Sequence, residues 1–152
     1  EIFTDIIYYF LNFNKVIVKT PKIYFHDTGL LCHLLGIRSQ EDLELHFAKG
    51  NIFENLVISE MYKNSINNAT KSKTYFWRDK SQNEVDLIVE TGVRLDAIEI
   101  KSAKTIYQNQ FRGLDYFKNL KADTNLHLVY GGNENQERTN YSVHSILNLP
   151  QF

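Results

Sequence analysis

Hydrophobic side chains in the first part of the chain follow a helical spacing and then an extended one. Residues 2–11 carry Phe, Ile and Leu side chains three or four positions apart, which predicts a helix. The β-branched residues 16–18 and residues 22–25 are each typical of a short strand, and Pro21 separates them. We therefore expect a short helix followed by two short extended segments.

A second short helix is expected directly afterwards. Asp27 and Thr28 precede the largely apolar residues 29–35, and Gly36 follows them. An Asp or Thr at the start and a Gly after the end are residues that cap the free backbone groups of a helix. Residues 37–49 are mostly polar and predict a linker with helical fragments.

The period of the pattern changes from helix to strand in the following part of the chain. Residues 51–66 place apolar side chains on one stripe and predict the longest helix. Residues 74–78, 84–90 and 95–101 are rich in β-branched and aromatic side chains, and short polar turns separate them. Three consecutive strands with short turns predict an antiparallel meander.

A helix and a nearly continuous apolar strand complete the pattern. Residues 106–120 predict an amphipathic helix, and residues 126–130 predict a strand buried on both faces, as in a parallel crossover. Residues 141–143 predict one further strand, and residues 145–149 a last helical turn. The fold class is therefore mixed α/β. We expect its α-β-β-β-α-β core to form a mixed sheet flanked by helices. A short helical segment at the N-terminus precedes this core.

Composition limits the classes of protein that fit this pattern. The chain has 152 residues, of which 43% are hydrophobic, which suits one compact domain with a substantial core. The 17 basic and 18 acidic side chains give a net charge of −1, which argues against a uniformly basic nucleic-acid binder. Cys32 is the only cysteine, which excludes an intrachain disulfide, and no apolar run is long enough to span a membrane. We expect a cytoplasmic protein with no membrane partner.

A local basic strip is nevertheless compatible with a nucleic-acid partner. Residues 63–80 contain five Lys or Arg side chains and a single Asp. Such a strip can follow a phosphate backbone, and a solvated loop is the alternative interpretation. The candidate DNA-binding residues are Lys71, Lys73, Arg78 and Lys80.

Polar side chains on strands that should be buried carry the chemical signal. Glu99 and Lys101 are two residues apart, so both point to one face of the same strand. Asp86 lies on the preceding strand across a short hairpin and is expected near Glu99. Two carboxylates can bind a hard cation such as Mg²⁺, with Lys101 placed to position a water or to stabilise negative charge. Glu54, at the border of the apolar stripe of the long helix, is expected to point to the same place.

Strict alternation also assigns the neighbours of these residues to a face of the sheet. Val85 and Leu87 are expected together on the face opposite Asp86. A simple alternative is that Glu99 and Lys101 form an ordinary salt bridge while Asp86 is a solvated residue. The strand-turn-strand arrangement, between an upstream and a downstream helix, favours a site over that alternative.

A motif on two of these strands resembles the PD-(D/E)XK motif of restriction-endonuclease-like nucleases. It consists of Asp86 and, on the next strand, Glu99-Ile100-Lys101, with Val85 where the motif often has Pro. The core of that family has the α-β-β-β-α-β order that the pattern of this chain predicts.

The resemblance covers roughly residues 50–131 and implies roles for individual side chains. It implies Mg²⁺ or Mn²⁺ as the cofactor and DNA as the substrate, with Gln110 in a region where several such families carry a Gln. The implied catalytic residues are Glu54, Asp86, Glu99 and Lys101, and the implied metal ligands are Asp86, Glu99 and the Ile100 carbonyl.

Longer segments resemble an uncharacterised domain at the C-terminus of bacterial AAA-type ATPases. They are residues 19–30, residues 50–60 and residues 76–86. This resemblance implies that an ATPase domain precedes the chain. Residues 1–49 are then a helical and extended linker segment, and residues 50–152 are the nuclease-like domain. No Gly-x-x-x-x-Gly-Lys-Ser/Thr loop occurs in the chain, so no P-loop for ATP is present in it.

We therefore expect a nuclease-like domain of an AAA-type ATPase that hydrolyses DNA phosphodiester bonds with a divalent metal ion. The sequence leaves two alternatives open, which are an inactive DNA-binding or regulatory module of the ATPase and a platform for homo-oligomer assembly. An Asp27-Thr28-Gly29 triplet matches aspartic proteases, but a helix N-cap explains it better.

Overall fold

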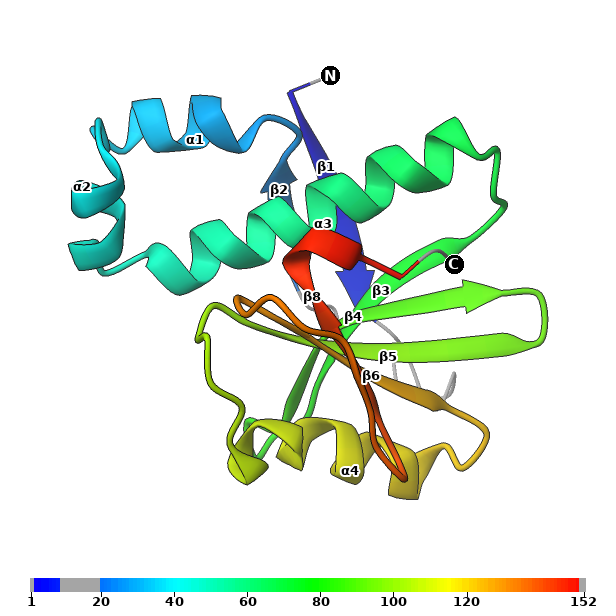
Figure 1. Ribbon diagram of the computed structural model, residues 1–152. Coiled ribbons are helices and arrows are strands. Elements are labelled where there is room, and N and C mark those ends of the chain that lie inside the picture. Colours follow the sequence, from blue (N-terminus) through cyan, green and yellow to red (C-terminus); the bar gives the residue numbers. More distant parts are fainter. Residues whose placement is uncertain (1, 9–19, 151–152) are drawn as a thin grey trace.

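The computed structural model describes residues 2–8 and 20–150 of the chain, and Figure 1 shows their arrangement. The strands of this part form one sheet in the order β2-β1-β3-β4-β5-β6-β8-β7. Their bounds are β1 Phe3–Tyr8, β2 Lys22–Phe25, β3 Lys73–Arg78, β4 Glu84–Thr91, β5 Arg94–Lys101, β6 Asn125–Tyr130, β7 Gln136–Glu137 and β8 Ser142–Ser145. The helices are α1 Thr28–Leu34, α2 Gln40–Leu45, α3 Lys49–Asn67 and α4 Arg112–Leu120, with 3₁₀ turns η1 Gln108–Phe111 and η2 Ile146–Asn148.

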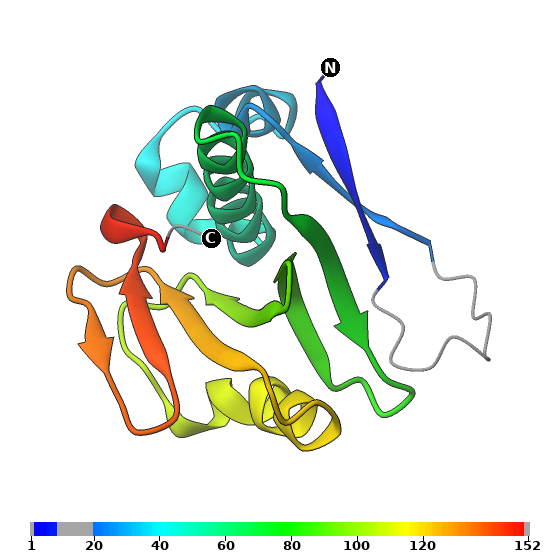
Figure 2. The same ribbon diagram turned by 90° about the vertical axis from the view of Figure 1, so that its right-hand side faces the viewer.

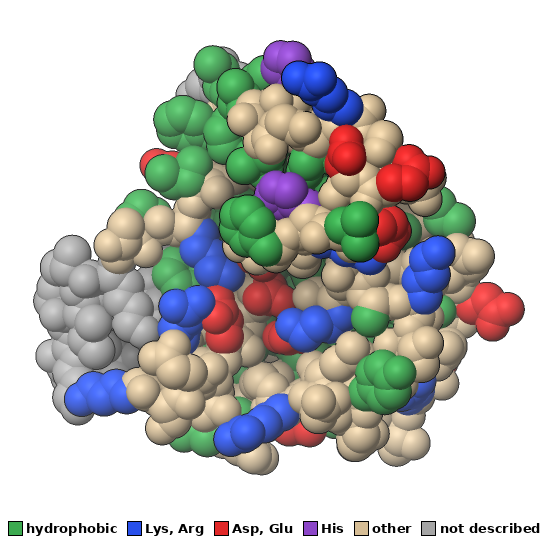
Figure 3. Space-filling view, turned by 90° about the vertical axis from the view of Figure 1, so that its left-hand side faces the viewer, with side chains coloured by type: hydrophobic (Ala, Val, Ile, Leu, Met, Phe, Trp, Pro, Cys, Tyr) green, Lys and Arg blue, Asp and Glu red, His purple; other side chains and the backbone are tan. Residues whose placement is uncertain are grey.

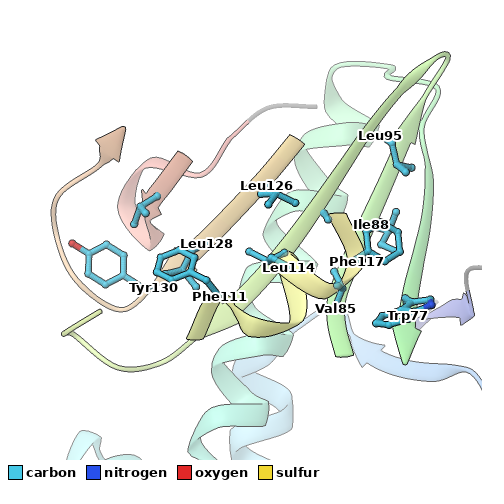
Figure 4. Close-up of a cluster of buried hydrophobic side chains, with 12 residues drawn as sticks. Trp77, Val85, Ile88, Leu95, Phe111, Leu114, Phe117, Leu126, Leu128 and Tyr130 are labelled. Carbon is cyan, nitrogen blue, oxygen red and sulfur yellow. The ribbon is translucent and has the colours of Figure 1, made fainter. Parts of the chain in front are cut away.

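Helices α3 and α4 cover opposite faces of the sheet (Figure 1). Under α3 lies a buried cluster made of Ile6, Tyr24, Val57, Ile58, Met61, Phe76, Leu87, Val89, Ile98, Ile100 and Val129. Under α4 lies a second cluster, shown in Figure 4, made of Trp77, Val85, Ile88, Leu95, Ala97, Phe111, Leu114, Phe117, Leu126, Leu128, Tyr130 and Val143. The central strands are therefore buried on both faces, and charged side chains on them need a specific reason.

The element order predicted for the second part of the chain is confirmed. Helix α3 is followed by β3, β4, β5, α4 and β6. Strands β3, β4 and β5 pair antiparallel, as expected for a meander. Strands β5 and β6 pair parallel from Asp96↔Asn125 to Lys101↔Tyr130, and α4 forms the crossover between them. The mixed α/β class is therefore right.

The first segment is a strand, so the helix predicted for residues 2–11 is wrong where the structure describes it. Strand β1 pairs antiparallel with β2, starting at Phe3↔Phe25, and parallel with β3 (Figure 2). Its aromatic and β-branched residues suit a pleated surface, and sheet pairing outweighs a helical spacing in so short a run. Residues 16–18, predicted as a strand, lie outside the described residues.

Helices α1 and α2 confirm the short helix and the helical fragment expected in the N-terminal segment. The Asp27 side chain accepts a hydrogen bond from the Leu30 N–H over 3.0 Å at the start of α1. Gly36 follows that helix with a φ of 75°, a conformation that suits glycine. At the start of α2, Ser39 and Asp42 form a capping box.

The second predicted amphipathic helix is shorter than the pattern indicated. It begins at Arg112 instead of residue 106, because the 3₁₀ turn η1 precedes it. Phe111, Leu114 and Phe117 are buried as the spacing predicts. In the described ranges, no helix combines the length and the apolar character that crossing a membrane requires.

Candidate functional site

A bulge in β4 changes which side chains of this strand share a face. Tyr75 pairs with Ile88 and Trp77 with Val85, so β3 advances by two residues where β4 advances by three. Val85 therefore packs under α4, whereas Leu87 packs under α3. The prediction that Val85 and Leu87 share one face is wrong, because strict alternation ends at a bulge.

The same part of β4 separates from β5 and places a carboxylate between the two strands. Pairing of the strands ends at Leu87↔Ile98, although both strands continue beyond this pair. Past that point, the Asp86 side chain accepts the Ile100 N–H over 2.9 Å. Asp86 is only 7% exposed. Its carboxylate thus replaces a backbone acceptor at the end of the ladder, which fixes its position.

Glu99 and Lys101 meet Asp86 at this opening, as the sequence predicts. The Lys101 ammonium pairs with Glu99 Oε1 and lies 3.8 Å from Asp86 Oδ2. Glu99 is 8% exposed, and its Oε2 atom is buried without a hydrogen-bond partner. A buried carboxylate oxygen that lacks a donor is costly, and a bound cation would satisfy it.

Glu54 also reaches the site, although other side chains link it to Asp86. The Lys22 ammonium lies 3.1 Å from Glu54 Oε1, 2.6 Å from Glu84 Oε1 and 3.9 Å from Asp86 Oδ1. The Tyr24 hydroxyl donates a second hydrogen bond to Glu54. Figure 3 shows acidic side chains in a hollow on one face of the molecule, with Lys and Arg side chains around them.

Sequence reasoning missed three members of this group, which are Lys22, Tyr24 and Glu84. Residues 22–25 were correctly predicted as a strand, and the period of two places Lys22 and Tyr24 on one face. That spacing was the available signal. The sequence alone does not show that β2 lies beside α3, which depends on the pairing of β1 with both β2 and β3.

The pKa values of the two buried carboxyls are raised, and repulsion between acids is part of the cause. Burial raises the pKa of Glu99 to about 8, and the charge of Asp86 adds to this. Burial raises the pKa of Asp86 to about 6, and the charge of Glu54 adds to this. Burial disfavours the charge on Lys101, but Asp86 and Glu99 outweigh it and raise the pKa of that lysine. The site is therefore short of positive charge.

The donor set fits a hard divalent cation held by few protein ligands. Asp86 and Glu99 supply two carboxylates, one of them with the unsatisfied oxygen. Within residues 2–8 and 20–150, no three His, Cys, Asp or Glu side chains converge in the manner of a complete metal cage. Mg²⁺ and Mn²⁺ suit such a site, because Mg²⁺ commonly takes one or two carboxylates together with oxygens from water and phosphate. The Ile100 carbonyl as a further ligand stays a prediction.

Helix α4 approaches this site closely because it carries a glycine in its first turn. A Cβ atom on Gly113 would lie 2.0 Å from the Glu84 carbonyl oxygen and 3.5 Å from Glu99 Oε2. Only glycine permits this distance. Gln110 lies before the helix and accepts the Tyr107 N–H over 3.0 Å, a local turn contact.

The basic strip predicted for DNA binding is divided between two ends of a strand. Lys73 begins β3 and Arg78 ends it, about 17 Å apart at the usual rise of a strand. Arg78 lies next to the acidic cluster, where its Nε donates to Glu84 Oε2 over 2.8 Å. Lys80 follows in the turn at the same end, and Lys71 precedes β3 at the other. Arg78 and Lys80 are thus at the site end of the strand.

A second polar cluster crosses β5, β6 and β8. Asp96 Oδ1 accepts hydrogen bonds from Arg94 Nε and Asn125 Nδ2, each over 3.0 Å. His127 Nε2 lies 3.1 Å from the same oxygen, and His127 Nδ1 lies 3.1 Å from His144 Nε2. The spacing of the histidines in the sequence gives no sign of this arrangement. Strand pairing alone brings them together.

Comparisons with known proteins identify related families over most of the chain. Residues 49–152 match the model of a domain of unknown function, DUF4143, and residues 2–41 match a second one, DUF8612. Uncharacterised proteins of Mycobacterium tuberculosis and Mycobacterium bovis are each 36% identical over 97 residues. This match covers 64% of the chain and 21% of each relative, so the chain spans about a fifth of their length.

Proposed function

We propose that this chain, which belongs to the DUF4143 family of domains of unknown function, is a metal-dependent nuclease-like domain that hydrolyses DNA phosphodiester bonds. The observation that supports this most is the meeting of Asp86, Glu99 and Lys101 where β4 and β5 separate. Buried carboxylates with perturbed pKa values beside a lysine are typical of a site that acts on phosphate.

Each residue of the group has a distinct role in the proposed reaction. A divalent ion, when bound, supplies Lewis acidity toward a phosphate oxygen and lowers the pKa of water. Asp86 and Glu99 would hold that ion, and the Ile100 N–H keeps Asp86 in place. The Lys101 side chain is 35% exposed, so its ammonium can reach an incoming phosphate and stabilise negative charge as it develops.

The architecture supports the same proposal. The α3-β3-β4-β5-α4-β6 order agrees with the core order of restriction-endonuclease-like nucleases, which the motif resembles. Arg78 and Lys80 lie at the end of β3 next to the site and are the proposed contacts to DNA on this side. Lys71 and Lys73 would contact the backbone farther away. By the resemblance to C-terminal domains of AAA-type ATPases, we also propose an upstream ATPase as a partner of this domain.

An interaction module without catalysis is the second candidate function, and exposed apolar side chains favour it. Leu34, Leu45 and Phe47, in α1, in α2 and just after α2, are 63%, 89% and 94% exposed. Apolar side chains gathered on one part of a surface are typical of contacts with another protein surface. They would suit an ATPase domain or a second copy of the chain. This candidate predicts DNA binding or assembly without cleavage.

Cleavage of supercoiled plasmid in the presence of Mg²⁺ or Mn²⁺ separates the two candidates. The wild-type chain should nick the plasmid, and Asp86→Ala and Lys101→Ala should each lower the rate by at least about 100-fold. Asp123→Ala and Lys121→Ala, at exposed positions, serve as matched controls and should retain the rate. Equal rates in all five chains would indicate a contaminating nuclease and contradict the proposal.

A further inference from the structure

Lys22 contacts three carboxylates of the acidic cluster at once. Its Nζ atom lies 2.6 Å from Glu84 Oε1, 3.1 Å from Glu54 Oε1 and 3.9 Å from Asp86 Oδ1. An ammonium group has three N–H donors, and these carboxylates surround them. The Lys22 side chain is 23% exposed. Little of this ammonium is therefore left to bind a phosphate.

Lys101, on the other side of the same aspartate, has a different environment. It pairs with Glu99 and lies 3.8 Å from Asp86 Oδ2, and its side chain is 35% exposed. The two lysines thus approach different oxygens of Asp86. Lys101 keeps access to substrate, whereas Lys22 is enclosed by acids.

Lys22 is held in this position by the strand that carries it. The Phe25 N–H donates to Asn55 Oδ1 over 2.7 Å, and Asn55 Nδ2 donates to the Phe25 carbonyl over 3.0 Å. Asn55 is 3% exposed and follows Glu54 directly on α3. The Tyr24 hydroxyl donates to Glu54 as well. Strand β2 is therefore fixed to the helix that supplies one of the three carboxylates.

We propose that Lys22 is a positioning residue whose ammonium takes the place of a second divalent cation among Glu54, Glu84 and Asp86. This inference rests on the proposed function, because it assumes that one divalent ion binds between Asp86 and Glu99. Some sites for phosphoryl transfer hold two metal ions, which stabilise the attacking and the leaving oxygen. Here a lysine supplies the second positive charge, so the site binds a single ion.

Two segments of the chain, matched by different family models, combine in this cluster. Lys22 belongs to residues 2–41, which match one family model, and the carboxylates belong to residues 49–152, which match the other. Without β2, these three carboxylates would lose the ammonium group that lies within 4 Å of all of them. The N-terminal segment therefore contributes a charge to the site in addition to its strand.

The number of Mn²⁺ ions bound per chain tests this inference without relying on cleavage. Electron paramagnetic resonance of free Mn²⁺ during a titration should give one ion for the wild-type chain. Lys22→Met keeps the length of the side chain and removes its charge, and it should bind two ions. Lys121→Met, at an exposed position, should bind one ion like the wild type.

Two ions on the wild-type chain, or a single ion on a folded Lys22→Met chain, would overturn the inference. Circular dichroism will show whether Lys22→Met is folded. If it is not, Glu84→Gln decides the matter, because it should leave one ion bound with unchanged affinity and would lose an ion if Glu84 held one. A wild-type chain that binds no Mn²⁺ would contradict the proposed function, and this inference with it.

Discussion

Strand β5 buries two carboxylates three residues apart, and their surroundings are opposite in character. Burial alone would raise the pKa of Asp96, but hydrogen bonds from His127 and Asn125 and the charge of Arg94 lower it below its usual value. Burial raises the pKa of Glu99 to about 8, and the charge of Asp86 adds to this. Asp96 Oδ1 has three partners within the chain and Asp96 Oδ2 lies 2.8 Å from Arg94 Nε, whereas Glu99 Oε2 is buried with no hydrogen-bond partner among the described residues.

This difference distinguishes a structural acid from the acid of the proposed site. Asp96 is 0% exposed and joins β5 to β6 through Asn125 and His127, so it contributes to the fold. Without a bound divalent cation, Glu99 lowers the stability of the folded state, because its charge is buried beside another acid. A buried acid that the fold leaves unsatisfied is a good candidate for binding a ligand. We therefore attribute stability to the Asp96 end of the strand and the proposed function to the Glu99 end.

The largest expected effect separates the two acids by activity. Glu99→Gln keeps the shape of the side chain and removes its charge, so cleavage should fall by about 10²–10³-fold. The free energy of unfolding without metal should stay equal or rise, because a buried charge disappears. Plasmid nicking and urea denaturation measure the two quantities. A Glu99→Gln chain that cleaves plasmid at the wild-type rate would contradict a role of Glu99 in cleavage.

Removing the other acid should affect stability instead. Asp96→Ala leaves Arg94, Asn125 and His127 without their acceptor and should lower the free energy of unfolding by about 3 kcal/mol. Cleavage per folded molecule should stay within about twofold, since Asp96 has no role in the proposed chemistry. Urea denaturation followed by circular dichroism gives the first value. A loss of less than about 1 kcal/mol would mean that this cluster is not structural.

A substitution in α4 should disturb the Glu99 end of β5 more than the Asp96 end. Gly113→Ala places a Cβ 2.0 Å from the Glu84 carbonyl oxygen, so the helix must shift. We expect a loss of about 1–3 kcal/mol in stability together with a lower cleavage rate. Gly50→Ala is the matched control, because its Cβ would meet no atom within 4 Å and alanine favours a helix. Equal effects of the two substitutions on thermal unfolding would contradict the close packing.

The smallest expected effect is a dependence of stability on pH at the Asp96 cluster. Burial lowers the pKa of His144 to about 4, and the charge of His127 adds to this, while Glu137 acts in the opposite direction. A histidine with a lowered pKa stabilises the fold above its unfolded pKa of about 6.5, and this stability is lost as the pH falls toward 4. His144→Gln should therefore show a flatter dependence between these pH values in urea denaturation. An unchanged slope would refute this assignment.

The sequence predicted the part of the site that follows from regular spacing. Glu99 and Lys101 share a face because a strand repeats every two residues, and a short hairpin brings Asp86 near them. The longest helix and the crossover to β6 were equally accessible, since each is a long or strongly patterned segment. These features depend on residues that are close in the sequence, so the pattern of one amino-acid sequence is enough to predict them.

The missing parts depend on contacts between distant segments. The bulge that puts Val85 and Leu87 on different faces arises from pairing with β3, which a period of two cannot show. Lys22 reaches the site only because β1 is a strand that pairs with β2 and β3, where the spacing had suggested a helix. The side-chain contacts from Asp96 to His127 and from His127 to His144 likewise require that β5, β6 and β8 pair in register.

Thermal unfolding with and without Mn²⁺ tests most directly whether the Asp86–Glu99 pair, and not Asp96, binds a divalent cation. At about 100 times the dissociation constant, Mn²⁺ should raise the Tm of the wild-type chain by about 5–10 °C. Asp96→Ala should start from a lower Tm and show the same rise, whereas Glu99→Gln should show almost none. A rise in Glu99→Gln equal to that of the wild type, or no rise in the wild type, would contradict the account.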